Sequence, residues 1–493
     1  FGYNTFNAYR RGFVSTSISE LFAGSQANWS NGGSSADGSR LSYFGRLDYA
    51  FDHKYLFQFV GRYDGSYLFP EDQRFGFFPA VSAGWRISQE SFFRDHVNFA
   101  NDLKLRASWG RTGNDIINAN SLVEGQQYLS GFQFGSGYVF GQDQVVQSIT
   151  PSNVANPYIT WEKADQLDLG IDGVLLANRL NFTFDYWHQM RSGILISRNA
   201  SIPQSAGLTL PRENLGKVKS WGYDGNITWN QKLNRDFSFN VSLNGGYATT
   251  SIVFWDEPAI APDYQRSTGL KTSTSLYYKA IGIFQTQEDV EKYPHWTGAR
   301  PGDVIYEDMN GDGKIDANDQ VRINKNNTPT VTGGLSLGAN WKQLSVNVLF
   351  QGAAGAVQYV STESGDIGNY LADFAEQRWK PDPSDPTGMT PDPTKSYYSG
   401  PRTFDRGDVY WTGSNSYFLR STDYVRLKSV QIGYDLPDNW LAKIGVENFR
   451  VYANGFNLVT WDKFKLMDPE ASNSAGNFYP QTRVYNIGFD LTF

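Results

Sequence analysis

The sequence of 493 residues contains no cysteine, only four histidines and few charged residues, which make up 19% of the chain. The absence of cysteine excludes disulfides, cysteine zinc sites, iron–sulfur clusters and thiol nucleophiles. The mean hydropathy is −0.47. The chain also lacks an uninterrupted apolar run of about 18 residues, which excludes a helical membrane protein. The formal net charge of −7 argues against nucleic acid as a partner.

The common catalytic motifs are missing as well. There is no G-x-S-x-G, no H-E-x-x-H and no phosphate-binding loop in the sequence. These patterns are typical of serine hydrolases, zinc proteases and nucleotide-binding enzymes, respectively. None of the histidines, His53, His96, His188 and His295, stands in an evident nucleophile context. We therefore expect that the protein is not an enzyme.

What the chain has in excess is aromatic residues, which make up 16% of it, and glycine, of which there are 49. The dominant pattern has a period of two: Tyr55, Phe57, Phe59 and Tyr63 share one side of an alternating segment. Such a period predicts β-strands with one apolar and one polar face. The same alternation recurs at 81–87, 103–109, 167–171, 180–186, 221–229, 237–247, 335–341, 344–350, 430–434, 449–453 and 485–493.

The connections between these segments alternate between short and long. Short links lie at 52–54, 176–179 and 233–236, whereas long polar links lie at 113–157, 197–213, 251–330, 357–418 and 461–480. Outer-membrane barrels have this organisation, with short periplasmic turns and long extracellular loops. The link at 89–100 is longer than a tight turn and fits the scheme less well.

We therefore predict an all-β transmembrane antiparallel barrel, with about fourteen strands including a partial one at 1–13. A water-soluble β-sandwich is the alternative, because it also alternates apolar and polar residues. Against it, many segments reach ten residues or more, enough for a tilted strand to cross a bilayer. Aromatic residues also gather near the strand ends, where membrane barrels carry aromatic girdles. The last segment, 483–493, alternates up to a terminal phenylalanine and resembles the recognition signal of the barrel assembly machinery.

Several longer stretches resemble the SusC/RagA-like family of TonB-dependent transporters, and the matches run in the family's order over residues 40 to 493. They are RYDGS (62–66), FGFFPAVSAGWRI (75–87), LKLRASWG (103–110), NPYITWEK (156–163), GDV (302–304) leading into DMNGDG (308–313), and YVRLK (424–428). The resemblance covers only the C-terminal half of such a protein. It implies a barrel of about 22 strands with a plugged lumen, of which residues 1–493 form the C-terminal part and the plug domain is absent from this chain.

The resemblance further implies a place in the bacterial outer membrane, in contact with lipid and lipopolysaccharide. A SusD-like surface lipoprotein would cover the mouth, and the TonB complex would act through the missing N-terminal part. The substrate would be an oligosaccharide or an oligopeptide. The alternative function is a passive channel or a surface-binding barrel without a plug.

One local motif fits the D-x-[DN]-x-[DN]-G template of calcium loops. Hard cations need several oxygen ligands around a tight turn, and the long link 251–330 supplies them in sequence. The predicted ligands of a structural Ca²⁺ are Asp308, Asn310, Asp312, Lys314 through its carbonyl, Asp316 and Asp319. The twelfth position is usually Glu, and Asp319 is shorter. The alternative is a turn rich in Asp and Asn that binds no metal.

Aromatic residues in the two longest links, 251–330 and 357–418, are candidates for ligand contact, because flat rings stack on sugars and anchor peptides. For each ring the alternative is packing of the loops onto one another or onto a partner. The candidates are Trp255, Tyr264, Tyr277, Tyr278, Trp296, Tyr370, Trp379, Tyr397, Tyr398, Tyr410 and Trp411.

Overall fold

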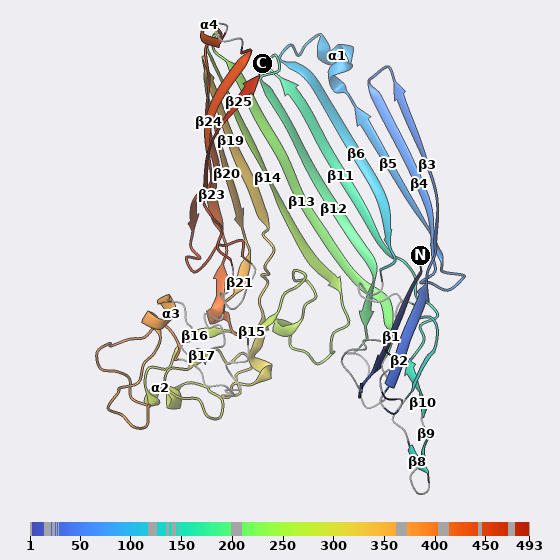
Figure 1. The fold of residues 1–493 in the computed structure, drawn as a ribbon, viewed down its shortest axis with the longest axis vertical. Coiled ribbons are helices and arrows are strands. Elements are labelled where there is room, and N and C mark those ends of the chain that lie inside the picture. Colours follow the sequence, from blue (N-terminus) through green and yellow to red (C-terminus); the bar gives the residue numbers. More distant parts are fainter. Residues whose placement is uncertain are drawn as a thin grey trace.

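The fold is built on one large antiparallel sheet, as shown by a computed structural model (Figure 1). The structure describes residues 2–13, 21, 25, 27, 29–116, 126–134, 138–140, 144–146, 148–198, 210–360, 372–402, 414–441, 446–471 and 479–492. Within these residues the sheet has 13 strands in the order β25-β24-β23-β20-β19-β14-β13-β12-β11-β6-β5-β4-β3. Strands that are neighbours in this sheet also follow one another along the chain, apart from the short strands in the links, so the sheet is a meander.

The strands of this sheet are long enough to cross a bilayer, as the sequence predicted. The longest, β13, has 21 residues. The strands are β3 (Arg40–Phe51), β4 (Tyr55–Ser66), β5 (Phe75–Trp85), β6 (Ala100–Asn114), β11 (Glu162–Leu175), β12 (Leu180–Ser197), β13 (Arg212–Lys232), β14 (Phe237–Phe254), β19 (Val331–Trp341), β20 (Leu344–Ala354), β23 (Tyr424–Asp435), β24 (Asn448–Asp462) and β25 (Val484–Thr492).

Small elements lie outside the main sheet. The short strands are β1 (Gly2–Arg10), β2 (Trp29–Asp37), β7 (Gly131–Phe134), β8 (Tyr138–Phe140), β9 (Gln144–Val146), β10 (Ile149–Asn153), β15 (Leu276–Tyr278), β16 (Ala280–Ile283), β17 (Val304–Tyr306), β18 (Gln320–Arg322), β21 (Val357–Tyr359) and β22 (Leu419–Ser421). The α-helices are α1 (Ser91–Arg94), α2 (Gln287–Lys292), α3 (Ala372–Gln377) and α4 (Asp438–Leu441), and 3₁₀ turns span Ile87–Gln89, Asp263–Gln265, Ala317–Asp319 and Ser416–Phe418. No helix in the described part of the chain is long and apolar enough to cross a membrane.

The two ends of the sheet differ as the link lengths predicted. In Figure 1 the tight turns lie at the upper edge with α1 and α4, and the long links gather at the lower edge. We call these edges the short-turn rim and the long-loop rim. At the short-turn rim Asp52 and His53 have φ values of 49° and 52°, which suit a type I′ hairpin turn because its twist matches that of the strands. The doubtful link at 89–100 carries α1 and lies at this same rim, so the alternation holds throughout.

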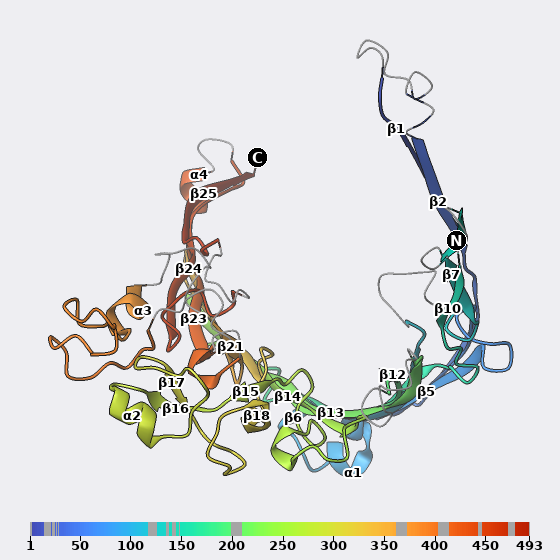
Figure 2. The ribbon, with the colours of Figure 1, turned by 90° about the horizontal axis from the view of Figure 1, so that it is seen from below.

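The first strand differs from the expectation for residues 1–13. β1 pairs with β2 in a separate two-stranded sheet, so the main sheet contains 13 strands where about fourteen were expected. β2 leads almost directly into β3, the strand at one edge of the main sheet. Figure 2 shows the main sheet as a curved wall that is open between its first and last strands.

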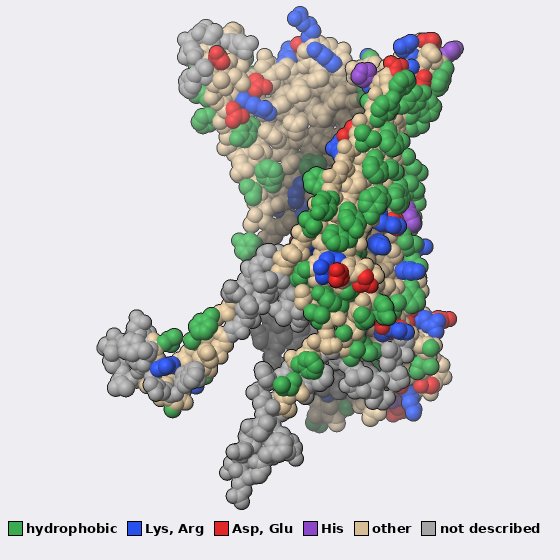
Figure 3. All heavy atoms as spheres, turned by 90° about the vertical axis from the view of Figure 1, so that its right-hand side faces the viewer, with side chains coloured by type: hydrophobic (Ala, Val, Ile, Leu, Met, Phe, Trp, Pro, Cys, Tyr) green, Lys and Arg blue, Asp and Glu red, His purple; other side chains and the backbone are tan. Residues whose placement is uncertain are grey.

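The sheet has an apolar face and a polar face, and its apolar face is bare. On β25, Tyr485, Ile487 and Phe489 are 72%, 86% and 67% exposed. Figure 3 shows hydrophobic side chains gathered along the face that carries β3 to β6. The buried hydrophobic clusters, by contrast, lie mostly in the links between strands, and Phe78 of β5 belongs to one of them. A single sheet with an apolar outer face is what a membrane barrel requires, because lipid covers that face.

Candidate functional site: the polar face and the long-loop assembly

The polar face carries a network of ion pairs that joins strands β6, β11 and β12. Arg106 donates to Asp172 over 2.9 Å and to Asp185 over 2.7 Å. A third carboxylate, that of Asp168, lies 3.8 Å from the same guanidinium. The three acids come from two neighbouring strands, so one arginine ties them together across the sheet. Such a polar wall suits a lumen that contacts water, a plug or a solute.

A glycine makes room for this network. Gly170 lies in register with both Arg106 and Asp185. A Cβ atom at this position would stand 2.4 Å from the carboxylate of Asp185 and 2.5 Å from the guanidinium carbon of Arg106. Any side chain at Gly170 would therefore push the ion pair apart, which explains a glycine in the middle of a strand.

Toward the long-loop rim the polar face is hollowed. A groove of 830 Å³ is lined by Asp224, Asn244, Gln351, Tyr424 and Glu470, together with several glycines of β13, β14, β19 and β20. Its side chains offer carboxylate, amide and phenol groups. A groove with such convergent polar groups is able to hold a polar solute or a segment of polypeptide.

One wall of this groove is fixed by Arg426 on β23, whose side chain is fully buried. It forms ion pairs of 2.6 Å with both Asp468 and Glu470, and it donates to Thr460 over 2.9 Å. Tyr424 donates to Glu470 over 2.8 Å. The link between β24 and β25 is thereby attached to the wall. A buried charge is tolerated only when it is paired in this way.

Sequence reasoning did not single out Arg106, Arg426 or their acids. The one available signal, for the residues that lie on strands, was their place on the polar side of the alternation. That signal does not distinguish a paired arginine from a solvated one, because the partners lie 42 to 79 residues away in sequence.

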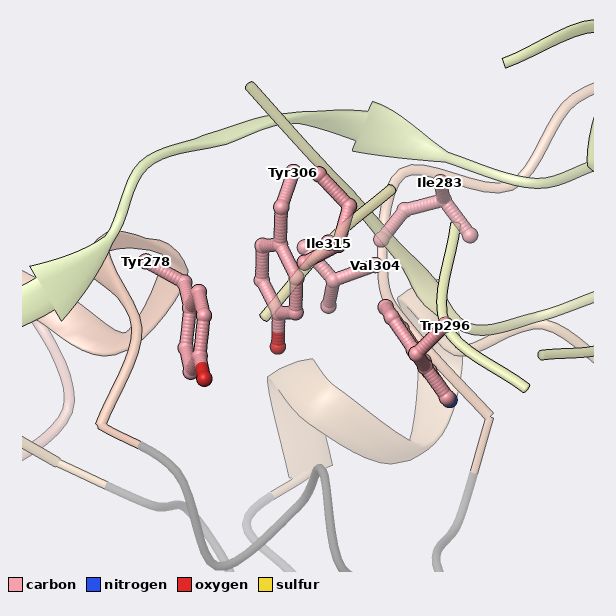
Figure 4. Close-up of a cluster of buried hydrophobic side chains, with 6 residues drawn as sticks. All are labelled: Tyr278, Ile283, Trp296, Val304, Tyr306 and Ile315. Carbon is pink, nitrogen blue, oxygen red and sulfur yellow. The ribbon is translucent and has the colours of Figure 1, made fainter. Parts of the chain in front are cut away.

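The long links at the long-loop rim fold into a compact unit. We call residues 255–330, 372–402 and 414–418 the loop assembly. Figure 4 shows its core, in which the rings of Tyr278 and Tyr306 stack with centroids 4.9 Å apart. Trp296 lies 5.3 Å from Tyr306, and Ile315 fills the cluster with 2% exposure. Because the links have their own hydrophobic core, they hold a defined surface at the mouth of the wall.

The predicted calcium loop, 308–319, lies against this core. The carboxylate of Asp308 accepts hydrogen bonds from the backbone N–H groups of Gly311 and Gly313, at 2.7 and 2.8 Å. The N–H donation from Gly313 holds the pKa of Asp308 below its usual range. Asp319 is fully buried and accepts from the backbone N–H groups of Met309 and Asp316, at 2.9 and 2.8 Å.

The other predicted ligands take part in the same turn. Asn310 accepts from the N–H of Asp312 over 3.0 Å, and Asp312 accepts from the N–H of Lys314 over 2.9 Å. Asp316 caps the 3₁₀ turn by accepting from the N–H of Asn318 over 2.7 Å. The loop thus forms Asx turns, which agree with a calcium loop and equally with the alternative, a turn that binds no metal. In the described part of the chain no three His, Cys, Asp or Glu side chains converge on a common point for a metal.

The loop also contacts the segment Asp263–Gln265. The hydroxyl of Tyr264 donates to the carbonyl of Asn318 over 2.7 Å, and the Gln265 amide donates to the carbonyls of Ala317 and Asn318. Burial raises the pKa of Tyr264, and the negative charges of Asp319, Asp308, Asp316 and Asp312 raise it further. Four carboxylates therefore act on one phenol, so negative charge is concentrated on this side of the loop.

A buried ion pair joins the two longest links. Arg402 donates to Asp303 over 2.7 Å, with side-chain exposures of 8% and 4%. The indole N–H of Trp379 donates to the carbonyl of Gln285 over 3.0 Å, and the Gln285 amide oxygen accepts from the N–H of Tyr398 over 2.9 Å. Residues that are about one hundred positions apart are thus held as one body.

The aromatic candidates fall into three groups. Tyr278, Trp296, Trp379 and Tyr398 are at most 7% exposed and pack inside the loop assembly. Tyr264 and Tyr277 are half-buried, and Tyr277 stacks on Tyr359 at 6.2 Å. Trp255 and Tyr397, at 38% and 60% exposure, present their rings to the surface. Tyr370, Tyr410 and Trp411 lie outside the described residues.

The buried rings pack against one another and build the core of the loop assembly, as the packing alternative describes. Contact with a ligand stays a prediction for the remaining candidates. Of these, Trp255 and Tyr397 are the most accessible of the described ones.

The comparison with known families agrees with this architecture. Residues 1–458 match the family model described as TonB dependent receptor-like, beta-barrel. The chain belongs to this family. The SusC/RagA-like resemblance, the transmembrane β-barrel fold class and the outer-membrane location predicted from the sequence are confirmed. The family consists of transporters and receptors and is not a family of enzymes.

Individual relatives give the same result. TonB-dependent receptor P26 of Formosa agariphila is 29% identical over 483 residues, which cover 92% of this chain and 46% of that protein. TonB-dependent receptor SusC of Bacteroides thetaiotaomicron is 25% identical, covering 92% of this chain and 44% of that protein. The chain therefore spans about half the length of the curated relatives that it matches.

Among solved structures, the RagAB peptide importer in its closed-closed state matches with a TM-score of 0.71 and 24% identity. The match covers 100% of this chain and 52% of the matched chain. At this identity the likeness shows the fold. The curved wall thus has the fold of about half of that matched chain.

Proposed function

We propose that this chain supplies barrel wall and outer loops to a TonB-dependent importer that takes up oligosaccharides or oligopeptides together with a surface lipoprotein. The observation that carries the proposal is the polar, hollowed inner face near the long-loop rim, in a chain of this family. A groove with carboxylate, amide and phenol groups suits a hydrated solute that is rich in hydroxyl or peptide groups.

The orientation follows from the two rims. In outer-membrane barrels the short turns face the periplasm and the long loops face outward. The loop assembly would then meet the lipoprotein and the solute first, with Trp255 and Tyr397 on its surface. The relative titled RagAB is called a peptide importer, and the relative called SusC is a TonB-dependent receptor. The first title supports an oligopeptide as the solute, whereas the oligosaccharide class rests on the resemblance of the sequence to SusC-like transporters.

The test is uptake by cells that produce the full-length protein. We expect growth on an oligosaccharide or an oligopeptide to depend on the protein, on TonB and on the gene product that forms the lid. The substitution pair Asp224→Asn and Gln351→Ala in the polar groove should lower uptake while the protein remains in the membrane. Lys395→Gln, on the loop assembly, is the control.

A passive channel is the competing function. It predicts uptake that persists without TonB and ungated conductance of the full-length protein in planar bilayers. Either result would replace active import with passive passage.

We further propose that the loop 308–319 binds Ca²⁺ as a structural clamp. The donor set, four carboxylates, one amide and one backbone carbonyl, is what a hard cation prefers. The proximity of Asp308 and Asp319, and their shared effect on Tyr264, support it. Because Ile315 anchors the loop in the hydrophobic core, a cation here would stabilise the whole loop assembly and would take no part in catalysis.

Chelation tests the clamp. We expect the full-length protein to lose thermal stability in EGTA and to recover it with excess Ca²⁺, by about 2.7 kcal/mol at one hundred times the dissociation constant. Asp312→Asn should abolish this response, while Asp385→Asn in another exposed turn should leave it intact. An identical melt with and without Ca²⁺ would remove the proposal and leave a metal-free turn.

A further inference from the structure

Four glycines form a row across the apolar face of the sheet. Gly225 on β13 lies in register with Gly245 on β14, Gly245 with Gly333 on β19, and Gly333 with Gly352 on β20. All four alternate with apolar residues and so belong to the apolar face. We call them the glycine row. Four adjacent strands therefore lack a side chain at one level of the wall.

Large side chains border this row on both sides. Their exposed apolar surface encloses a hollow of 960 Å³, which we call the apolar trench. Phe184 and Val425 stand at its two ends, in register with Gly225 and Gly352. One border consists of Tyr223, Tyr247 and Val331, and the other consists of Ile227, Leu243, Leu335 and Phe350.

No side chain covers the glycine backbone at the bottom of the trench, at Gly245 and Gly333. A Cβ atom at Gly245 or Gly333 would meet only the backbone of the neighbouring strand, at 3.2 and 3.0 Å, and no side chain lies over either position. Glycine inside a strand costs about 0.5–1 kcal/mol relative to alanine, so four in register are expensive. Such glycines typically mark a place where another molecule approaches the backbone closely.

The aromatic border is rigid. The rings of Tyr223 and Tyr247 stack with centroids 5.6 Å apart, and Phe184 stacks on Tyr223 at 6.2 Å. The four glycines span three interstrand spacings, or about 14 Å. The trench is therefore an open, preformed hollow with apolar walls, and its face is the one that meets lipid in a membrane barrel.

A basic side chain lies on the same face, between the trench and the long-loop rim. Lys219 is exposed and in register with Met190 and Ser251. Two strands away, on β11, Asp165 lies in register with Met190 and is already bound by Arg111 over 2.7 Å. Within the described residues no ion pair involves Lys219. Lys217, two residues farther along, is exposed too.

The distance between the lysines and the glycine row has the scale of one lipid leaflet. Lys219 precedes Gly225 by six residues, which is about 20 Å along a strand. A strand tilt of about 40° reduces this to about 15 Å of depth, which is half of a hydrocarbon core of about 30 Å. A lipid whose phosphate meets the lysines would reach the trench with its acyl chain.

We propose that the apolar trench binds an acyl chain of a phosphate-bearing lipid of the outer leaflet, with its headgroup held by Lys217 and Lys219. Charge complementarity favours an anionic headgroup, and a flexible acyl chain suits an open apolar hollow of 960 Å³. A second copy of the wall fits poorly, because a concave surface applied to its own copy in a twofold dimer leaves a void.

The experiment uses full-length protein extracted in a mild detergent, freed of lipid and examined by native mass spectrometry. The probes are lipid A with its phosphates, dephosphorylated lipid A and phosphatidylglycerol. The wild-type protein should retain one phosphate-bearing lipid. Lipid A and phosphatidylglycerol distinguish the two natural sources of the same chemistry.

Two variants address the two parts of the site. Gly245→Leu with Gly333→Leu fills the trench, and Gly45→Leu is the matched control on the apolar face, since a Cβ atom there meets nothing within 4 Å. Lys217→Gln with Lys219→Gln removes the charges at exposed positions. We expect the filled trench to lose the lipid and the lysine pair to weaken it on the order of tenfold. Gly45→Leu should retain it.

Four outcomes would overturn the proposal. A folded trench variant that keeps the lipid, or a control that loses it equally, removes the trench as its site. Loss of a dimer in place of a lipid would show that a second copy occupies the trench. If the leucine variant does not fold, the lysine pair decides: equal retention of phosphorylated and dephosphorylated lipid A by the wild type and the lysine variant contradicts the headgroup site.

Discussion

At the residue scale, the polar face of the wall depends on a few arginines that hold carboxylates from distant segments. Arg106 does so in the middle of the sheet, and Arg426 does so where the link between β24 and β25 meets β23. In both cases the arginine supplies a fork of N–H donors that matches carboxylate geometry. The wall is thus connected across strands by charge as well as by its backbone ladder.

Replacing Arg426 tests this role. Arg426→Met keeps much of the volume but leaves Asp468 and Glu470 without their partner. We expect a loss of about 3 kcal/mol, the scale for removing one member of a buried pair, measured by guanidinium unfolding of the detergent-solubilised protein. Arg46→Met is the control, because Arg46 and Asp48 are 62% and 54% exposed and such pairs contribute less than about 1 kcal/mol. Equal losses for the two variants would contradict the buried-pair interpretation.

The Asp308 carboxylate gives the loop assembly a pH dependence with a definite sign. Its pKa is lowered in the folded protein, chiefly by the N–H of Gly313. Its contribution is therefore complete above the unfolded value of about 3.9 and is lost as the pH falls through the lowered pKa. Protection of the amides in 308–319, corrected for intrinsic exchange, should stay constant down to about pH 5 and decrease only well below it. In Asp308→Asn this acid transition should be missing; if it persists there, another group controls the loop.

At the element scale, the strands of the main sheet follow the period-two alternation of the sequence. The strands of the main sheet place most of their apolar residues on one face, and the register carries that choice from strand to strand. The sheet therefore needs no second protein layer, and its buried hydrophobic clusters lie mostly in the links, with Phe78 of β5 as a member of one.

Neighbouring residues of β13 test which face meets lipid. Ile227 lies on the apolar face at 44% exposure, and Asn226 lies on the polar face, in register with Asn244. Ile227→Arg should cost about 2–4 kcal/mol near the bilayer midplane, whereas Asn226→Arg should change stability by less than about 1 kcal/mol. Unfolding of the protein in lipid vesicles measures both, and the reverse order would exchange the two faces.

At the scale of the whole molecule, the long links form one body beside the wall at its long-loop rim (Figure 2). The pair of Asp303 and Arg402 connects residues 99 positions apart, and Trp379 and Tyr398 attach the second link to the first through Gln285. A mouth made of one body presents a fixed surface to a lid or a solute.

Breaking this pair tests whether the links act together. Arg402→Met should leave Asp303 buried without its partner and speed proteolysis within 372–402 severalfold, while the wall remains folded. Arg266→Met is the matched control, since it removes a pair in which Asp263 is 95% exposed. Mass spectrometry of the fragments from limited trypsin digestion provides the measurement. Unchanged cleavage would show that other contacts hold the links together.

Much of this protein was determined by its sequence alone. The alternation in segments such as 55–63 and 237–247 set the strands, their two faces and the membrane wall, because side chains on a strand point to opposite sides. The unequal links set the two rims, and the SusC/RagA-like stretches indicated the family that the comparisons confirm.

Only the tertiary structure decided which residues meet. Arg426 and Glu470, Asp303 and Arg402, and the four glycines of the row are each brought together by strand register or loop packing over long stretches of chain. Tyr278 and Trp379 had the same appearance in the sequence as Trp255, yet they are buried and Trp255 is exposed. The reason is that alternation is a local property of the backbone, whereas pairing and burial depend on contacts between segments that are remote in sequence.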